Sequence, residues 1–238
     1  MASETDWRRL EQRISGAVGS ERAVGVAFLD EPPPDVRKFE GTAPSGCSFW
    51  RLAAAGRSFY TVPNDHFNCA VGAHTHNIPL SSEREKETGQ MLQMMFDLGY
   101  MKPEEVERIP RLPKTPAVVA YAPLGALSFA PDVVLFACKP SGAMLFCEAA
   151  ARARIGNVAP VLGRPTCMAL PASLETGSLL SLGCIGNRVY TGLGEEELYF
   201  VLRGKDLAAL ADALDVVVRA NQALKEYARG RQEQLARA

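Results

Sequence analysis

The sequence predicts a single α+β domain with a mixed β-sheet, flanking helices and a long C-terminal helix. Two apolar, β-rich runs, Ala117–Tyr121 and Val133–Cys138, are bounded by prolines and are predicted to be buried strands. Helical patterns occupy residues 5–18, as an amphipathic helix, and residues 205–235, as the C-terminal helix. Because strands and helices do not alternate regularly between these ends, an α+β arrangement is favoured over a doubly wound one.

Size and charge limit the classes of protein that this chain can represent. Its 238 residues are enough for one sizeable core, and we treat 1–238 as a single domain. Hydrophobic residues make up 47% and charged residues 22%, as in ordinary globular proteins. The formal net charge of −1 argues against capture of nucleic acid or of an anionic membrane surface. No run reaches the roughly 18 apolar residues of a membrane span.

The beginning of the chain, MASETDWRRLEQRISG, is polar and lacks the apolar stretch of a secretory signal. We therefore expect a cytoplasmic protein. In a reducing cytoplasm its six cysteines are expected to be free, metal-bound or catalytic, and disulfides are the alternative only if the compartment differs.

The first half of the chain gives mostly local signals. Apolar side chains recur at helical spacing from Trp7 to Val18, and three consecutive prolines end the apolar run that follows. The elements predicted next are a strand at Ala23–Leu29, a short helix at Phe49–Ala55, a strand at Ser58–Val62, an irregular loop with about one helical turn at Asp65–Pro79, a helix from Glu83 to Gly99 and a helix at Pro103–Arg108.

The second half begins with the two buried strands and continues with mixed signals. Its further elements are a helix at Pro140–Arg154, an apolar stretch at Cys167–Leu174, and strands at Leu179–Cys184 and Glu197–Leu202 with a glycine-rich segment between them. A parallel βαβ unit around Val133–Val161 is an open alternative for part of the sheet.

The cysteines divide into two groups. Cys47, Cys69, Cys167 and Cys184 lie in short, turn-prone settings with small neighbours, where the backbone can approach a metal or cluster closely. Cys138 closes an apolar run and Cys147 lies in a helical pattern, so both are expected to be structural. Four thiolates can complete the first shell of zinc or of an iron–sulfur cluster. No C-x-x-C pair occurs, and unconnected thiols therefore remain an alternative.

Five motifs occur along the chain in the order GCSFW, FYTVPNDHFNCAVG, PDVVLFACKPSGAM, PTCMALPAS and LGCIGNR, followed by EEEL. This order resembles the prokaryotic family named domain of unknown function 169. The resemblance spans about Val24 to Leu202. It implies that the turn cysteines, Cys47, Cys69, Cys167 and Cys184, form one set, and an all-sulfur set favours an iron–sulfur cluster. The resemblance implies no particular reaction.

Two departures from the family pattern bear on this resemblance. Asn187 stands where the pattern has an aspartate, and an uncharged amide cannot act as a base. The His74-Thr75-His76 segment is not expected in the family at this place.

Three histidines, His66, His74 and His76, form a second group of candidate residues. The imidazoles of His74 and His76 can ligate a metal or bind a cofactor, and the alternative is a surface or hydrogen-bonded role. Cys69 with His66 or His74 is also the candidate pair for thiol catalysis, although no protease signature is present.

The glycine-rich segment from Gly183 to Gly194 carries Arg188, whose planar guanidinium suits a carboxylate or phosphate. Its spacing matches neither a P-loop nor a dinucleotide fingerprint. Arg188 and Asn187 are therefore candidate cofactor-binding residues. The alternative is a hairpin in which Arg188 pairs with Glu196 or Glu197.

These observations lead to one function hypothesis and two alternatives. The hypothesis is a cytoplasmic protein whose four turn cysteines bind an iron–sulfur cluster, most simply a 4Fe-4S cluster, with redox or electron-transfer activity toward a small molecule or a redox partner. The alternatives are a zinc-stabilised or metal-free ligand-binding domain and a cysteine-dependent enzyme. Neither a nucleic acid nor a membrane is expected as a partner, and a homo-oligomer is left open.

Overall fold

A seven-stranded mixed sheet organises the chain in the computed structural model, which describes residues 6–20, 22–156 and 161–237. The strand order is β2-β3-β1-β4-β7-β6-β5, and every neighbouring pair is antiparallel except β5 and β6. The strands are β1 (Arg22–Leu29), β2 (Phe59–Thr61), β3 (Val118–Pro123), β4 (Val133–Cys138), β5 (Val161–Leu162), β6 (Ser178–Ser181) and β7 (Leu198–Arg203). The expected α+β fold with a mixed sheet is confirmed.

The helices and 3-10 turns surround this sheet. The α-helices are α1 (Trp7–Val18), α2 (Cys47–Ala54), α3 (Ala70–Thr75), α4 (Ser82–Asp97), α5 (Pro103–Glu107), α6 (Pro140–Ala153), α7 (Ala169–Thr176), α8 (Ile185–Thr191) and α9 (Leu207–Ala236). The 3-10 turns are η1 (Pro63–His66), η2 (Leu124–Ala126), η3 (Thr166–Met168) and η4 (Gly204–Asp206).

The central position of β4, with a core on each face of the sheet, explains why its sequence is apolar throughout. Val134, Phe136 and Cys138 face one hydrophobic core, and the alternate residues Val133, Leu135 and Ala137 face a second core. Side chains alternate between the two faces of a strand, so a strand covered on both faces needs apolar residues at every position. The run VVLFAC is therefore a strand buried on both sides.

The first core lies between the sheet and α1, α6 and α9. Phe146 of α6 stacks on Phe200 of β7 with ring centroids 4.4 Å apart and also packs on Phe136 of β4. Leu210 and Leu214 of α9 are buried in the same core. The predicted core face of the C-terminal helix is thus present in its N-terminal half.

The second core lies beneath α2 and α7 on the opposite face of the sheet. Phe49 and Trp50 of α2 are buried here, with Leu170 of α7. Phe49 also contacts Tyr121 of β3, with ring centroids 5.5 Å apart. This face carries the starts of the helices on which the candidate cysteines lie.

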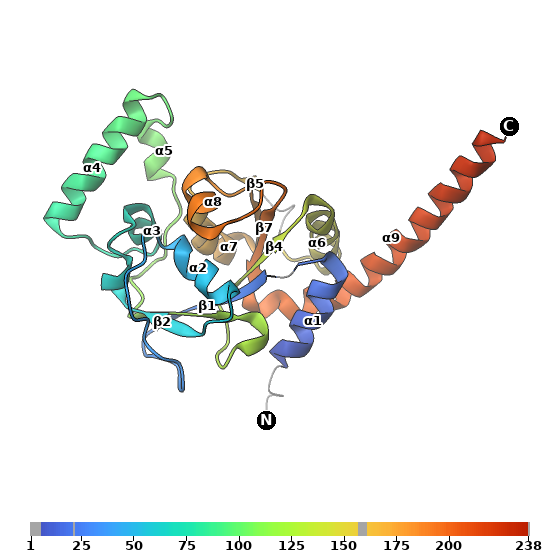
Figure 1. The fold of residues 1–238 in the computed structure, drawn as a ribbon, viewed down its shortest axis with the longest axis horizontal. Helices are drawn as coiled ribbons and strands as arrows, with labels where there is room; N and C mark the ends of the chain where they lie inside the picture. Colours follow the sequence, from blue (N-terminus) through green and yellow to red (C-terminus); the bar gives the residue numbers. More distant parts are fainter. Residues whose placement is uncertain (1–5, 21, 157–160, 238) are drawn as a thin grey trace.

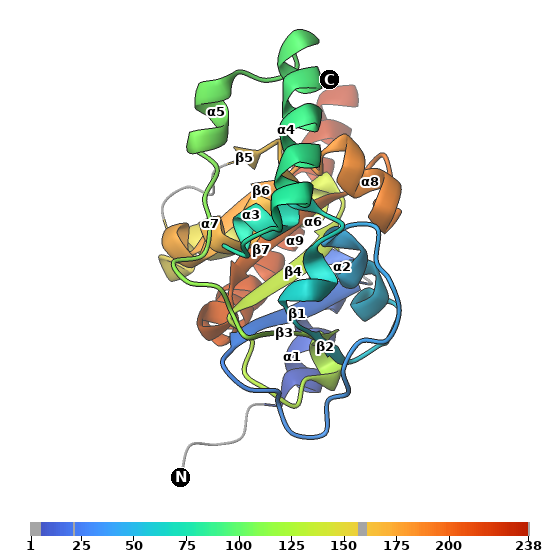
Figure 2. The same cartoon turned by 90° about the vertical axis from the view of Figure 1, so that its left-hand side faces the viewer.

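Two segments stand away from the body in Figure 1. At one end α4 and α5 lie side by side, as Figure 2 also shows, and α4 has no buried residue. The apolar face expected for this helix therefore does not pack into either core. At the other end the C-terminal half of α9 extends outward, with exposed Leu224 and Tyr227.

Three segments are more helical than the sequence predicted. The glycine-rich segment expected to be a loop or hairpin contains α8, because Arg188 fixes the surrounding backbone through hydrogen bonds and Gly192 ends the helix in the left-handed region. The expected irregular loop contains η1 and α3. The apolar stretch that begins at Cys167 is η3 followed by α7.

The alternative parallel βαβ unit is not formed by neighbouring strands. After β4 the chain passes through α6 to β5, and β7 and β6 lie between these two strands in the sheet. The direct partners of β4 are β1 and β7, and both are antiparallel to it. Among the described residues, no helix has the length and apolar character needed to cross a membrane.

Gly204, directly after β7, offers a test of how the end of β7 packs beside the start of β4. A Cβ at this position would collide with the carbonyl of Pro131, while the Gly204 N–H donates to Asp132 O at 2.8 Å. We expect Gly204→Ala to lower the free energy of unfolding by about 1–3 kcal/mol in urea denaturation, because the backbone has to move. Gly89→Ala in α4, where a Cβ meets nothing within 4 Å, should leave stability equal or slightly higher. Equal stability of the two variants would contradict the packing described.

Candidate functional site

The four turn cysteines all lie where helices begin. Cys47 is the first residue of α2, Cys69 is the N-cap of α3, Cys167 lies in η3 directly before α7, and Cys184 is the N-cap of α8. Backbone N–H groups at a helix start have no partner within the helix and favour negative charge. One such contact is seen at Cys69, whose Sγ accepts a hydrogen bond from the Gly72 N–H at 3.3 Å.

Glycines allow the first two of these helix starts to approach each other closely. A Cβ built on Gly46 would lie 3.8 Å from the Cα of Gly72, and one built on Gly72 would lie 3.0 Å from Cys69 Sγ. A side chain at Gly72 would therefore crowd the Cys69 sulfur, whereas one at Gly46 would make an ordinary contact with the Cys69 loop. The small neighbour at Gly72 thus leaves room for this sulfur.

The other two cysteines are joined through Thr166. The backbone N–H of Cys184 donates to Thr166 Oγ1 at 2.5 Å, and Thr166 is the residue before Cys167. The start of α8 is thus tied to η3. In addition, α2 packs against α8 and α3 packs against η3, so all four helix starts meet on one side of the sheet.

The ionisation of the thiols shows that all four share one electrostatic environment. Hydrogen bonding to Cys167 lowers the pKa of Cys47, although burial opposes this shift. The pKa of Cys167 is raised well above its usual value by the same hydrogen bond, by burial, and by negative charge on Cys47, Cys69 and Cys184. Burial raises the pKa of Cys69, with smaller contributions from Cys47 and Cys184. Repulsion among these thiolates is the condition that a bound cation would relieve.

The chemistry of the four thiols bears on what they could bind. Within residues 6–20, 22–156 and 161–237, no three His, Cys, Asp or Glu side chains are arranged to hold a single metal ion. All six cysteines are free thiols. Four thiols are the ligand set of a structural zinc ion as well as of an iron–sulfur cluster. The donor set of four thiols fits an iron–sulfur cluster in its chemistry.

Asn187 lies at the edge of this group with its amide unsatisfied. Its side chain is 1% exposed, and neither Nδ2 nor Oδ1 has a hydrogen bond of ordinary geometry. The amide nevertheless lies close enough to Cys47 to contribute to the lowered pKa of that thiol. Buried amides without a protein partner are uncommon, so the Asn187 amide is available to hydrogen-bond a neighbouring atom. The sequence position that departs from the family pattern therefore faces the cysteines.

Tyr121 is a second unsatisfied group near the cysteines, and no sequence motif indicates it. Its buried hydroxyl has no hydrogen bond of ordinary geometry. Burial raises its pKa far above the usual value, with further contributions from Cys47 and Cys69. Tyr121 was predicted only as the end of a buried strand, and its proximity to the thiols depends on how α2 crosses β3.

His66 and His76 form a buried pair, with ring centroids 5.1 Å apart. His76 Nδ1 lies 2.8 Å from the carbonyl oxygen of Gly72 and must carry the proton, since a carbonyl only accepts. Thr61 Oγ1 donates to the carbonyl of Val119, so His66 Nε2, 2.8 Å from Thr61, is assigned as the donor in that contact. The remaining nitrogens, His66 Nδ1 and His76 Nε2, are unprotonated and have no partner.

Burial lowers the pKa of His66 well below its usual value and that of His76 to about 4. Both rings are therefore neutral near pH 7. Asp65 does not orient the His66 ring, because its carboxylate accepts from the backbone N–H of Val62 at 2.8 Å. The sequence placed His76 together with His74, whereas the structure pairs His76 with His66.

His74 and Arg188, the other candidate residues, lie in surroundings different from those of the buried histidine pair. His74 is only partly buried, and burial together with the charge of Arg111 lowers its pKa. Arg188 donates to three backbone carbonyls, those of Leu182, Gly194 and Glu197, at 2.6–2.9 Å. The guanidinium of Arg188 thus holds the loops around α8 together, and the expected pairing with Glu196 does not occur because Glu196 pairs with Lys139.

Cys138 and Cys147 are separate from this group, as the sequence predicted. Cys138 is buried in the first core, where burial raises its pKa to about 12. Burial also raises the pKa of Cys147, which lies on α6. Neither thiol contributes to the pKa shifts of Cys47, Cys69 and Cys167.

The fold and site define an α+β protein with four cysteines gathered at helix starts on one face of a mixed sheet. The chain belongs to the DUF169 family, described as uncharacterised ArCR, whose family model matches residues 19–213. It is also 25% identical over 202 residues to the uncharacterized protein MJ0308 of Methanocaldococcus jannaschii. This match covers 81% of this chain and 85% of that protein. No solved structure matches the chain.

Proposed function

We propose that this protein binds an iron–sulfur cluster through Cys47, Cys69, Cys167 and Cys184 and acts in redox or electron transfer. The observation that supports this most is the proximity of the four thiols: Cys47 and Cys167 are hydrogen-bonded to each other and buried, and Cys69 and Cys184 lie close enough to raise the pKa of Cys167 further. Ionising all four buried thiols together is strongly unfavourable unless a cation is bound among them. The all-sulfur donor set favours a 4Fe-4S cluster, and a zinc ion is the alternative.

Two buried groups support the proposal by their position. Asn187 and Tyr121 both lie near Cys47, and both lack hydrogen-bond partners. Their N–H and O–H groups can donate to cluster or cysteine sulfur, and such hydrogen bonds stabilise negative charge and raise a reduction potential. When bound, the cluster would supply one-electron redox chemistry toward a small molecule or a redox partner. Free thiols and this chemistry both suit the cytoplasm.

The test is anaerobic purification followed by counts of iron, acid-labile sulfide and zinc per chain. We expect iron and sulfide in equal amounts, near four of each for a 4Fe-4S cluster, together with the broad thiolate-to-iron absorption band. One zinc per chain with no sulfide would instead establish the zinc-stabilised domain. A protein free of all three after anaerobic preparation and reconstitution with iron and sulfide would overturn the proposal.

A cysteine-dependent enzyme is the second candidate, because the pKa of Cys47 is lowered while that of Cys167 is raised. Of these two thiols, Cys47 is therefore the one that loses its proton more readily. This difference also moves the candidate nucleophile from Cys69, whose pKa is raised, to Cys47. Rapid labelling of Cys47 alone by iodoacetamide in anaerobically purified protein would favour this candidate. Protection of all four thiols until a chelator is added would favour the cluster.

A further inference from the structure

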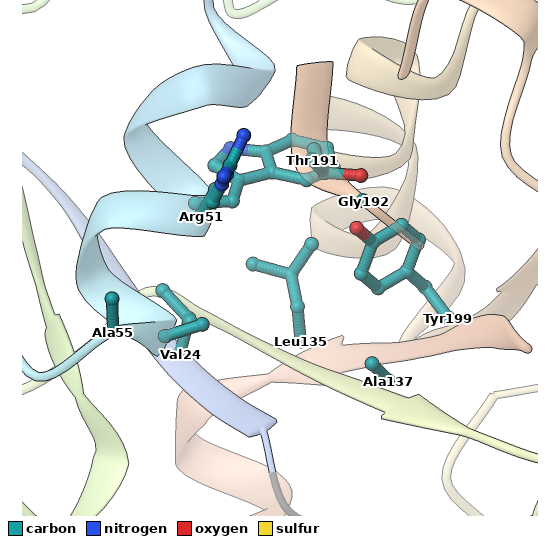
Figure 3. A pocket seen from close by; sticks show the side chains of 10 residues that line it. Val24, Arg51, Ala55, Leu135, Ala137, Thr191, Gly192 and Tyr199 are labelled. Carbon is teal, nitrogen blue, oxygen red and sulfur yellow. The ribbon is translucent and has the colours of Figure 1, made fainter. Parts of the chain in front are cut away.

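A cavity of about 360 Å³ lies between α2 and the sheet, in a place that the sequence did not indicate. Figure 3 shows it from close by, with Arg51 and Ala55 of α2 on one side and Tyr199 of β7 and Leu135 of β4 rising from the sheet. Thr191, at the end of α8, is on the remaining side. A volume of this size is in the range of small-molecule sites.

The walls of the cavity are mainly aromatic and aliphatic. Trp50 and Tyr199 meet edge to face, with ring centroids 5.6 Å apart and an interplanar angle of 88°. Val24, Leu135 and Ala137 form an aliphatic floor on the sheet. Two rings at right angles above a flat aliphatic surface suit a small planar or branched apolar body.

Arg51 gives the cavity its only charge among the described residues that line it. No hydrogen bond or ion pair joins its guanidinium to another side chain in the described part of the chain. This contrasts with Arg188, which is fully occupied by backbone carbonyls. An unpaired guanidinium at the mouth of an apolar cavity suits a carboxylate, which it can bind through two parallel hydrogen bonds.

We propose that this cavity binds a small organic carboxylate whose body is aromatic or branched aliphatic. The apolar body lies between Trp50, Tyr199 and the aliphatic floor, and the carboxylate pairs with Arg51. A neutral analogue loses the pairing with Arg51 and should bind more weakly.

The cavity and the cysteines are connected through two helices. Cys47 begins α2 and Arg51 lies one turn later, about 6 Å along the helix axis. Cys184 caps α8 and Thr191 is the last residue of that helix. Carboxylate binding depends on the cavity alone, whereas the role of this ligand as the small molecule served by the cluster rests on the proposed function.

Isothermal titration with phenylacetate tests the assignment. We expect saturable binding to the wild-type protein, and binding of phenylacetamide that is weaker by about tenfold or more. Arg51→Gln should weaken phenylacetate binding by about tenfold or more and leave phenylacetamide unaffected. Because Arg51 is exposed, this variant should fold normally. Ala55→Phe places a ring in the cavity and should reduce binding of both compounds.

The matched control is Arg219→Gln, which removes an exposed arginine from α9, far from the cavity, and should leave both affinities unchanged. Absence of saturable phenylacetate binding, or equal affinities of the wild type and Arg51→Gln, would overturn the assignment. Iron, zinc and sulfide are counted in the same samples, so that the presence of a cluster is measured independently of carboxylate binding. A metal-free protein that still discriminates phenylacetate from phenylacetamide through Arg51 would retain the carboxylate site and lose only the cluster.

Discussion

Replacing any one of Cys47, Cys69, Cys167 or Cys184 by serine should remove the iron–sulfur absorption band and most of the bound iron and sulfide. A serine hydroxyl is a harder and less acidic ligand than a thiol, and each of the four sulfurs supplies one of the cluster's protein ligands. The measurement is the absorption spectrum and the iron and sulfide content of each variant after anaerobic reconstitution. The largest loss is expected for Cys47 and Cys167, which are the two most deeply buried members of the set.

The chain itself provides matched controls for this series. Cys138→Ser and Cys147→Ala change thiols that lie outside the group, and both variants should keep the wild-type iron and sulfide content. Cys138→Ser is expected to lower stability, because it leaves a hydroxyl in the first core, so circular dichroism should accompany the metal counts. Retention of the full cluster in two or more of the four serine variants would show that these cysteines do not act together.

The sequence predicted the sheet strands and terminal helices well because their signals are local. In β4 the continuous apolar run reflects burial on both faces, and in α1 the helical spacing of apolar residues reflects one buried face. The helix α8 was missed because its glycine and asparagine have low helix propensity. The hydrogen bonds from Arg188 that hold this helix come from loops that only the folded chain brings together.

The candidate site was predictable only in part, for the same reason. Turn-prone settings separated the four clustered cysteines from Cys138 and Cys147 without any knowledge of the fold. The pairing of His66 with His76 depends on α3, which the sequence did not define as a helix. No sequence pattern identified Tyr121, Thr61 or Arg51 as site residues. Each belongs to an ordinary strand or helix pattern, and tertiary packing alone brings it to the site.

The buried histidine pair should make the protein sensitive to mild acid. In the unfolded chain His76 takes up a proton near its ordinary pKa of about 6.5, whereas in the folded protein its pKa is about 4. Between these values the unfolded state binds more protons, so the free energy of unfolding falls as the pH falls. For His76 alone the full loss is about 3 kcal/mol, with about 2 kcal/mol of it between about pH 6.5 and pH 5. His66, whose pKa is also lowered, adds to the loss in the same direction.

Urea denaturation at several pH values across this interval provides the measurement. His76→Gln should lower stability near pH 7, because the hydrogen bond from Nδ1 to the Gly72 carbonyl is lost, but its stability should then decline less steeply with acid. His74→Gln is the matched control from the same helix region and should keep most of the wild-type slope, since His74 is only partly buried. A wild-type protein whose stability is flat over this interval would show that the two rings are not held neutral. Equal slopes for the wild type and His76→Gln would show that His76 does not contribute, and the acid sensitivity would then belong to His66.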